Sequence, residues 1–241
     1  MAEGLIDIHC HILPGLDDGS QDMAQTIEML KIARQDGIEG IVASPHVMNG
    51  LYDNSREGIG EAIASVKGAA NGVALYPGAD VHISRDLLEN ARKGTLPLIN
   101  DKNYLLLELP TFVLPPMAEL ERIIAGLKFR GVTPVITHPE RNVAILEDVS
   151  ILHRLLDLGA LCQLTAASIT GRFGARVQKA CFKMLKKKQV HVVATDAHDV
   201  KKRPPVLSEA HARIANKFGP SQAARLFISN PFRIVNGEPV N

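Results

Sequence analysis

Residues 7–19 read DIHCHILPGLDDG, and a short apolar run of strand type leads into them. His9 and His11 lie two positions apart, so on an extended chain both imidazoles point to the same side. Two neutral imidazoles placed side by side can bind one divalent cation through one ring nitrogen each. A Pro-Gly pair then ends the strand, and Asp17 and Asp18 bring carboxylates back toward the same place. Taken alone, the stretch also fits a strand end with two polar histidines and a solvated acidic turn.

Apolar runs of strand type alternate with helical patterns along the whole chain. We predict strands near residues 5–9, 40–44, 73–79, 104–108, 133–137, 160–164 and 190–195. We predict helices near residues 22–36, 54–70, 84–93, 117–130, 149–157, 173–188 and 206–217. Repeated strand–helix units of about 30 residues indicate an α/β fold with parallel strands and right-handed crossovers.

A closed barrel fits this alternation better than an open sheet with one crevice. The reason is that residues able to carry chemistry follow nearly every predicted strand, and in a barrel all of those strand ends share one rim. The composition does not change along the chain and the sequence does not repeat. We therefore predict one domain that covers residues 1–241.

Composition narrows the possible functions. The chain has 241 residues and a net charge of +1, which favours neither nucleic acid nor an anionic membrane as partner. No apolar run approaches the ~20 residues of a membrane span. No basic stretch followed by a signal-type apolar run stands near the first residues, so we do not expect export. Cys10, Cys162 and Cys181 are scattered and odd in number, as in a cytoplasmic protein with reduced thiols. We expect Cys10 to point away from its histidine neighbours into the core.

The predicted strand ends supply an unusual number of metal-binding side chains. The candidate ligands are His9, His11, Asp18, His46, Asp80, Glu108, His138, Asp196 and His198. Imidazoles and carboxylates without thiolates suit Mn²⁺, Fe²⁺ or Zn²⁺ in an open catalytic site. One ion cannot use all of these ligands, and we infer two or three metal ions.

Other residues near these motifs allow two interpretations each. Glu108 ends a strongly apolar strand and would bridge ions, or form an ion pair with a barrel lysine. Arg141 and Arg203 would bind phosphate oxygens, since a planar guanidinium matches them, or are surface charges. The apolar loop 109–116 would form a wall for an aromatic ring, or is only a rigid barrel loop. His82 remains ambiguous and is not assigned.

Several remaining polar residues are expected to be structural. His153, His191 and His211 belong to helices or strands in this interpretation and not to the metal site. The lysine run 186–188 is most simply a solvated helix C-terminus favoured by the helix dipole.

Several motifs, in order along the chain, resemble the polymerase-and-histidinol-phosphatase (PHP) superfamily. The motifs are HCHILPGLDDG from residue 9, SPH from 44, ELP from 108, THPER from 137, GRFG from 171 and DAH from 196. Within that superfamily the chain looks most similar to the bacterial manganese-dependent protein-tyrosine phosphatases of capsule and exopolysaccharide operons. The resemblance runs from the first strand to the Asn-Pro pair at residue 230.

The resemblance implies a distorted seven-stranded, TIM-like barrel that holds a trinuclear Mn²⁺ centre. It implies His9, His11, Glu108 and Asp196 around one ion, Asp80, Glu108 and His138 around a second, and Asp18, His46 and His198 around the third. Arg141 and Arg203 match phosphate-binding arginines. The family usually has Glu where this chain has Asp80, which brings the occupancy of that site into question.

The implied reaction is hydrolysis of phosphotyrosine by a hydroxide bridging the metal ions. The implied partner is the tyrosine-rich tail of a bacterial tyrosine kinase of polysaccharide export. A cysteinyl-phosphate route is excluded because no Cys-x5-Arg loop is present. The alternatives are a small-molecule phosphomonoesterase such as histidinol phosphatase, an amidohydrolase, and a non-catalytic metal-stabilised module. The metal in the cell, the physiological substrate, the general acid and the oligomeric state stay open at this point.

Overall fold

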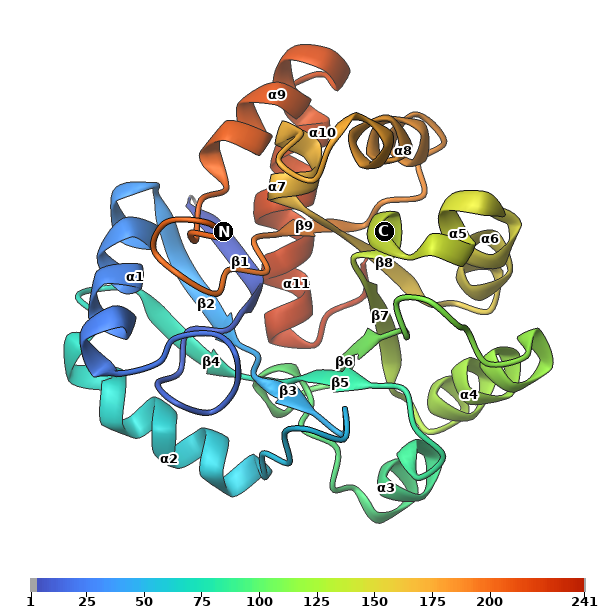
Figure 1. The fold of residues 1–241 in the computed structure, drawn as a ribbon, viewed down its shortest axis with the longest axis horizontal. Coiled ribbons are helices and arrows are strands. Elements are labelled where there is room, and N and C mark those ends of the chain that lie inside the picture. Colours follow the sequence, from blue (N-terminus) through green and yellow to red (C-terminus); the bar gives the residue numbers. More distant parts are fainter. Residues whose placement is uncertain (1–3, 241) are drawn as a thin grey trace.

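The computed structural model describes residues 4–240, which form two parallel β-sheets surrounded by helices (Figure 1). One sheet has the order β1-β2-β4, and the other has the order β3-β5-β6-β7-β8-β9. The strands are β1 Leu5–Cys10, β2 Ile38–Ala43, β3 His46–Val47, β4 Ala74–Pro77, β5 Asp80–His82, β6 Tyr104–Glu108, β7 Thr133–Thr137, β8 Leu161–Thr165 and β9 Val192–Ala194. The predicted α/β class with parallel strands is confirmed.

The sheet breaks where the sequence predicted continuous strands. The second predicted strand continues past Pro45 as β3, and the third divides at Gly78 into β4 and β5, which lie in different sheets. Proline has no N–H for the ladder, and a Cβ on Gly78 would lie 2.5 Å from the Val42 side chain. Because β2 pairs with β4 and β3 pairs with β5, both neighbours change sheet together. The break turns the ends of these strands toward the centre of the molecule.

Backbone hydrogen bonds connect the last strand position with the first. The Asp196 N–H donates to the His9 carbonyl at 2.8 Å, and the His11 N–H donates to the Ala197 carbonyl at 2.9 Å. The buried Asp7 carboxylate accepts from the backbone N–H and the hydroxyl of Thr195. These contacts bring the seven predicted strand positions around a common centre.

Most helices surround the strands in Figure 1. They are α1 Met23–Gln35, α2 Arg56–Val66, α3 Leu87–Lys93, α4 Met117–Phe129, α5 Val143–Glu147, α6 Ser150–Asp157, α7 Ala166–Thr170, α8 Ala175–Lys186, α9 Ser208–Phe218, α10 Pro220–Ala224 and α11 Asn230–Asn236. Short 3₁₀ turns are η1 Lys67–Ala69, η2 Ile99–Asp101 and η3 Pro139–Arg141, and η4 Arg225–Ser229 is a π-helical turn. The segment from α10 to α11 was not predicted as helical.

The apolar core has an outer and an inner part. The outer part lies between the strands and the surrounding helices and contains Cys10, as expected. The inner part is formed by alternate strand residues such as Leu106 and Val135, together with Ile234 and Val235 of α11. α11 appears behind the strands in Figure 1, at the end opposite to the one that faces the viewer.

Inward-facing positions become polar one step beyond this inner core. Since strand side chains alternate with a period of two, Glu108 follows Leu106 on the inner face and Thr137 follows Val135. In the same way Gln163 follows Leu161 on β8. The fold therefore places a layer of polar side chains on an apolar floor.

Candidate metal centre

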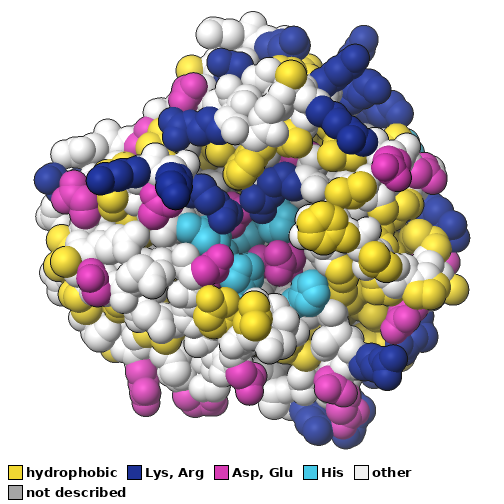
Figure 2. Space-filling view, in the orientation of Figure 1, with side chains coloured by type: hydrophobic (Ala, Val, Ile, Leu, Met, Phe, Trp, Pro, Cys, Tyr) yellow, Lys and Arg dark blue, Asp and Glu magenta, His cyan; other side chains and the backbone are white. Residues whose placement is uncertain are grey.

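A hollow opens at the carboxyl ends of the strands, with histidines and acids at its floor and arginines at its edge (Figure 2). Its volume is about 300 Å³. Its lining includes Asp18, His46, Glu108, His138, Asp196 and His198, together with Arg141 and Arg203. This is the end of a parallel barrel at which functional sites are found.

All nine predicted ligands gather there in four overlapping groups. Within each group, one nitrogen or oxygen atom per residue lies within 4.8 Å of the others. The groups are His11, Asp18, His46 and His198; His9, His11 and Asp196; His9, Asp80 and His138; and His46, Asp80 and Glu108. Residues that are far apart in the sequence thus share one cluster.

The first two histidines present the same ring atom to the cluster. Their Nε2 atoms lie 3.1 Å apart, so both rings turn the same nitrogen toward one place. The Nδ1 atom of His9 contacts Oε1 of Gln163 at 3.0 Å, and Nδ1 of His11 contacts Oδ2 of Asp17 at 2.6 Å. Such a contact at the second nitrogen fixes the tautomer and the ring orientation of a metal-binding histidine. Gln163 was not predicted as part of the site, because an internal strand glutamine has no distinguishing pattern.

The turn after β1 is held tightly against His11. Asp17 also accepts hydrogen bonds from the N–H groups of Gly19 and His46, each at 2.9 Å. A Cβ on Gly19 would lie 2.2 Å from the His11 carbonyl oxygen, so this close approach requires glycine. The neighbouring Asp18 is instead free to face His46 and His198, at 3.5 and 3.6 Å.

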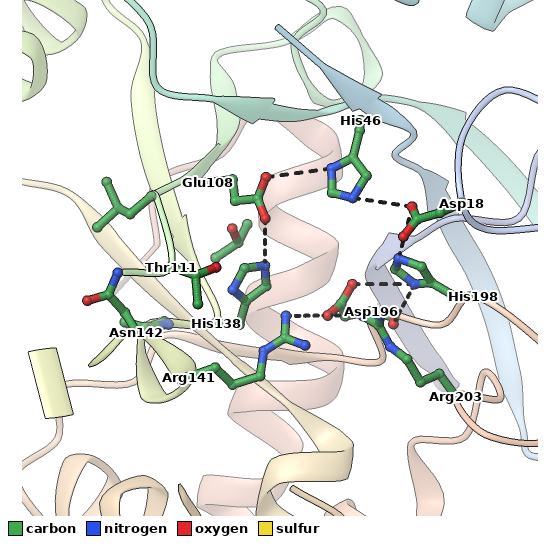
Figure 3. A pocket seen from close by; sticks show the side chains of 13 residues that line it. Asp18, His46, Glu108, Thr111, His138, Arg141, Asn142, Asp196, His198 and Arg203 are labelled. Atoms are coloured by element: carbon green, nitrogen blue, oxygen red, sulfur yellow. Dashed lines mark hydrogen bonds and ion pairs between the residues drawn. The ribbon is translucent and has the colours of Figure 1, made fainter. Parts of the chain in front are cut away.

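Asp196 divides its two carboxylate oxygens between different partners (Figure 3). Oδ1 lies 3.4 Å from Nε2 of both His9 and His11. Oδ2 accepts hydrogen bonds from Arg141 and Arg203. Burial by itself would raise the pKa of Asp196, but Arg141 and then His9 hold it well below its usual range. The two predicted arginines therefore contact a predicted ligand directly.

Asp80 is fully buried, and its Oδ2 atom has no hydrogen-bond partner among the described residues. That atom lies 3.5 Å from Nε2 of His9, 3.6 Å from Nδ1 of His46 and 3.9 Å from Nε2 of His138. Although Asp is one methylene shorter than Glu, the side chain faces the centre of the cluster.

Glu108 is surrounded by histidines. Its carboxylate lies 3.6 Å from both His46 and His82 and 3.8 Å from His138. Within residues 4–240, no lysine or arginine forms an ion pair with it, so the alternative of a barrel lysine is not supported. Burial and then the nearby Asp80 raise the pKa of Glu108 to about 8.

The donor set fits divalent cations. Buried acids and imidazoles face one another, and both Oδ2 of Asp80 and Nδ1 of His46 lack a hydrogen-bond partner in the described part of the chain. Burial lowers the pKa of His11, but contacts with Asp17 and Asp196 raise it to about 10. A cation with imidazole and carboxylate ligands would replace such protons. Buried unpaired polar atoms are costly, and coordination would remove that cost.

Residues predicted to be structural lie elsewhere. His191 accepts a hydrogen bond at Nδ1 from the Cys162 N–H, and the His211 ring packs edge-on against Phe227. In the loop 109–116, Leu109 is buried and lines the hollow, whereas Phe112 and Val113 are 79% and 80% exposed.

Among the described residues, no helix is long and apolar enough to cross a membrane.

The chain is similar over most of its length to bacterial proteins of capsule synthesis. The capsular polysaccharide synthesis family CpsB/CapC matches residues 5–236. The chain is 37% identical over 219 residues to the tyrosine-protein phosphatase YwqE of Bacillus subtilis, covering 89% of this chain and 85% of YwqE. It is 30% identical over 240 residues to the tyrosine-protein phosphatase CpsB of Streptococcus pneumoniae, covering 96% of this chain and 98% of CpsB.

A solved structure of this kind of phosphatase has the same fold as this chain. It belongs to a study of YwqE and CpsB as unique metal-dependent tyrosine phosphatases, and it superposes with a TM-score of 0.92 at 34% identity. The match covers 98% of this chain and 96% of that chain. A dihydropyrimidinase from Brevibacillus agri superposes with a TM-score of 0.56 at 15% identity, which shows a shared fold alone.

Proposed function

The chain belongs to the CpsB/CapC family of capsular polysaccharide synthesis, and from that premise we propose that it is a metal-dependent protein-tyrosine phosphatase. In this proposal residues 1–241 act as one domain that hydrolyses phosphotyrosine in another protein. The observation that carries the proposal is the cluster of nine nitrogen and oxygen donors with two arginines at its edge.

The cysteines do not offer another route. Cys10, Cys162 and Cys181 are buried, and burial raises the pKa of each thiol. A thiolate is the nucleophilic form, and these environments disfavour it. Hydrolysis in the proposed reaction therefore depends on the histidine and carboxylate cluster.

The proposed ligand sets are those that the family resemblance implies. His9, His11, Glu108 and Asp196 would hold one ion, Asp80, Glu108 and His138 a second, and Asp18, His46 and His198 a third. Asp18, His46 and His198 of the third set lie in one group of donors, whereas Glu108 is grouped with His46 and Asp80. We propose Mn²⁺ as the metal, because imidazole and carboxylate ligands without thiolates suit it; Fe²⁺ and Zn²⁺ are the competitors. When bound, such ions polarise phosphoryl oxygens and lower the pKa of an attacking water.

Arg141 and Arg203 are suited to orient the phosphoryl group. Each uses one terminal nitrogen on Asp196, and the buried Nε atom of each has no partner among the described residues. Both side chains stay partly exposed at the edge of the hollow, at 21% and 28%, and a planar guanidinium there matches phosphate oxygens, where negative charge accumulates during transfer. By contacting Asp196 at the same time, the arginines also fix the position of a proposed ligand.

The leaving group fits this site. A tyrosine phenol has a pKa of ~10 and needs less protonation on departure than an alkyl alcohol. The hollow has an apolar wall at Leu109, next to Thr111, which the aromatic ring of the substrate would contact. The site therefore does not need a strong general acid.

The family gives the biological setting of the proposal. We propose the tail of a bacterial tyrosine kinase of polysaccharide export as the protein substrate, and the cytoplasm as the place of action. Three buried cysteines without a disulfide are in keeping with a reducing compartment.

Arginine substitutions test the proposal. We expect Arg141→Ala and Arg203→Ala each to lower kcat/KM for a phosphotyrosyl peptide roughly 100-fold, by analogy with loss of one transition-state donor. The Mn²⁺ content should stay near that of the unmodified protein, because the remaining arginine still holds Asp196. The double variant should also lose metal. Steady-state kinetics and elemental analysis give the two readings.

Arg154→Ala is the matched control, because Arg154 is exposed and pairs with Glu121 on the helical surface. It should leave kcat/KM unchanged. Faster turnover of histidinol phosphate than of the phosphotyrosyl peptide would assign the site to a small-molecule phosphatase instead. Loss of metal in a single arginine variant would mean that its role is to hold Asp196 and not to bind phosphate.

A further inference from the structure

A second hollow lies between α5 and α8, outside the metal centre. It has a volume of about 460 Å³, and its floor is formed by apolar side chains that include Ile145, Leu146 and Met184. Its rim carries five exposed cations: Arg176, Lys179, Lys183, Lys186 and Lys187. Figure 2 shows Lys and Arg side chains gathered over α8, at the upper right of the view. Among residues 4–240, Glu147 is the one acid that lines this groove.

These cations differ from most others on the helices. Arg92 pairs with Glu89, Arg154 with Glu121, and Arg56 with Asp101. Across residues 4–240, none of the five cations at the groove has an acidic partner within 4 Å. The whole chain has a net charge of only +1, so a one-sign cluster is a local property of this groove.

Helix stability does not explain the arrangement. Lys183, Lys186 and Lys187 lie at the C-terminus of α8, where the helix dipole favours cations. Arg176, however, lies in the first turn, where the dipole disfavours them. Lys179 and Lys183 are four residues apart, and like charges at this spacing repel each other on a helix. The helix dipole therefore does not account for Arg176, and the spacing of Lys179 and Lys183 is not one that stabilises a helix.

The groove begins beside the metal centre. Asn142 lines the metal hollow and caps α5 by accepting from the Ile145 N–H at 3.1 Å, and Ile145 lines the groove. On the other side, the Arg141 guanidinium lies 5.1 Å from the centre of the Phe173 ring, two residues before α8 begins. Short stretches of chain, from Asn142 to Ile145 and from Phe173 to Arg176, thus connect residues at the metal hollow with residues that line the groove.

We propose that this groove binds an acidic segment of the polypeptide that carries the phosphotyrosine. The proposal rests on the proposed function, because it needs a protein substrate whose chain continues out of the metal hollow. The twelve residues of α8 span about 18 Å, which about six residues of extended peptide would cover. Acidic side chains would meet the cations on the rim, and apolar ones would contact the floor. The groove then selects among phosphotyrosines by the residues that flank them.

Charge reversal on α8 tests the groove. The probes are two phosphotyrosyl peptides that are equal except for a run of Glu or of Gln about four to nine residues from the phosphotyrosine, with the run placed on either side. Lys183→Glu should raise KM for the Glu peptide roughly three- to tenfold, and Lys179→Glu combined with it should raise KM further. The kcat value, the KM for the Gln peptide and the turnover of p-nitrophenyl phosphate should not change.

Lys67→Glu is the matched control, because Lys67 is exposed on η1, away from α5 and α8, and the change in net charge is the same. If Lys183→Glu and Lys67→Glu changed KM for the Glu peptide equally, or if neither changed it, the proposed role of the groove would be wrong. Binding of the unphosphorylated Glu peptide, measured by fluorescence anisotropy at low and high salt, tests the groove even if phosphotyrosine is not hydrolysed. A third outcome would also overturn the proposal. If Lys183→Glu reduced sedimentation with anionic vesicles but did not change peptide binding, the cations would belong to a membrane-binding surface.

Discussion

Asp17 shows how a residue beside a metal cluster shapes the cluster without facing it. Its Oδ2 atom contacts Nδ1 of His11 and the N–H of His46, which belong to two different strand positions. Burial would raise the pKa of Asp17, but the hydrogen bond with His11 keeps it well below the usual range. The carboxylate is therefore ionised and holds two proposed ligand segments in one place.

We predict that Asp17→Asn weakens metal binding roughly 10- to 100-fold, because an amide is uncharged and its one oxygen cannot accept both from His11 and His46 at the Oδ2 position and from the Gly19 N–H at the Oδ1 position. Calorimetric titration of chelator-treated protein with Mn²⁺ measures the affinity. Asp22→Asn is the control, since Asp22 caps α1 by accepting from the Gln25 N–H and lies outside the cluster. An Asp17→Asn variant with unchanged affinity would show that His11 needs no partner at its second nitrogen.

At the scale of elements, α11 closes the end of the strands opposite the metal centre. Ile234 and Val235 pack into the inner core with residues from β1, β6 and β7. The Asn100 side chain donates to the Val235 carbonyl at 2.8 Å, and the Tyr104 hydroxyl donates to the Glu238 carbonyl at 2.7 Å. The helix therefore supports the apolar floor on which the polar layer rests.

We expect Ile234→Ala to lower the free energy of unfolding by about 2–4 kcal/mol, because the side chain is fully buried and its loss leaves a cavity. Urea denaturation measures this change. Since the substitution lies at the far end of the strands, kcat at temperatures well below the unfolding midpoint should remain the same. The exposed Asn236→Ala is the control, for which we expect a much smaller change. A large fall in kcat for fully folded Ile234→Ala protein would contradict the expectation that packing at α11 affects stability and not the metal centre.

At the scale of the whole molecule, buried titratable groups connect stability to pH. His191 lies away from the metal cluster, where burial and then Arg225 lower its pKa from 6.5 to about 4. The unfolded chain therefore binds a proton at this residue between these two pH values, whereas the folded chain does not. The contribution of neutral His191 to the free energy of unfolding is therefore complete above the pKa of the unfolded chain. It is lost as the pH decreases toward the pKa of the folded chain.

We predict that protonation of His191 in the unfolded chain lowers the free energy of unfolding by roughly 2–3 kcal/mol as the pH falls from about 7 to about 4. Urea titrations across that range, with chelator present so that metal binding does not contribute, should show a steeper loss for the unmodified protein than for His191→Asn. The asparagine oxygen can still accept from the Cys162 N–H, as Nδ1 of His191 does. Parallel pH profiles for the two proteins would show that His191 does not titrate in this range.

Local sequence patterns were enough to predict the fold class and the members of the cluster. Strand periodicity and the repeated order of strand and helix were sufficient to predict parallel strands, and the histidines and acids stand at predicted strand ends. These features are local, because the period of two and the position of a strand end depend on neighbouring residues only. For the same reason His9 and His11 could be assigned to one side of the chain before any contact was known.

The contacts that hold these residues in place could not be predicted from the sequence, because they join distant segments. Gln163 meets His9 across 154 positions of sequence, and Thr195 meets Asp7 across 188. The contact of both arginines with Asp196, the division of the sheet at Gly78 and the closing role of α11 depend on similar long-range packing. No local pattern encodes such pairs, because which residue fills a site depends on the space left by segments that are distant in sequence and meet only in the folded chain.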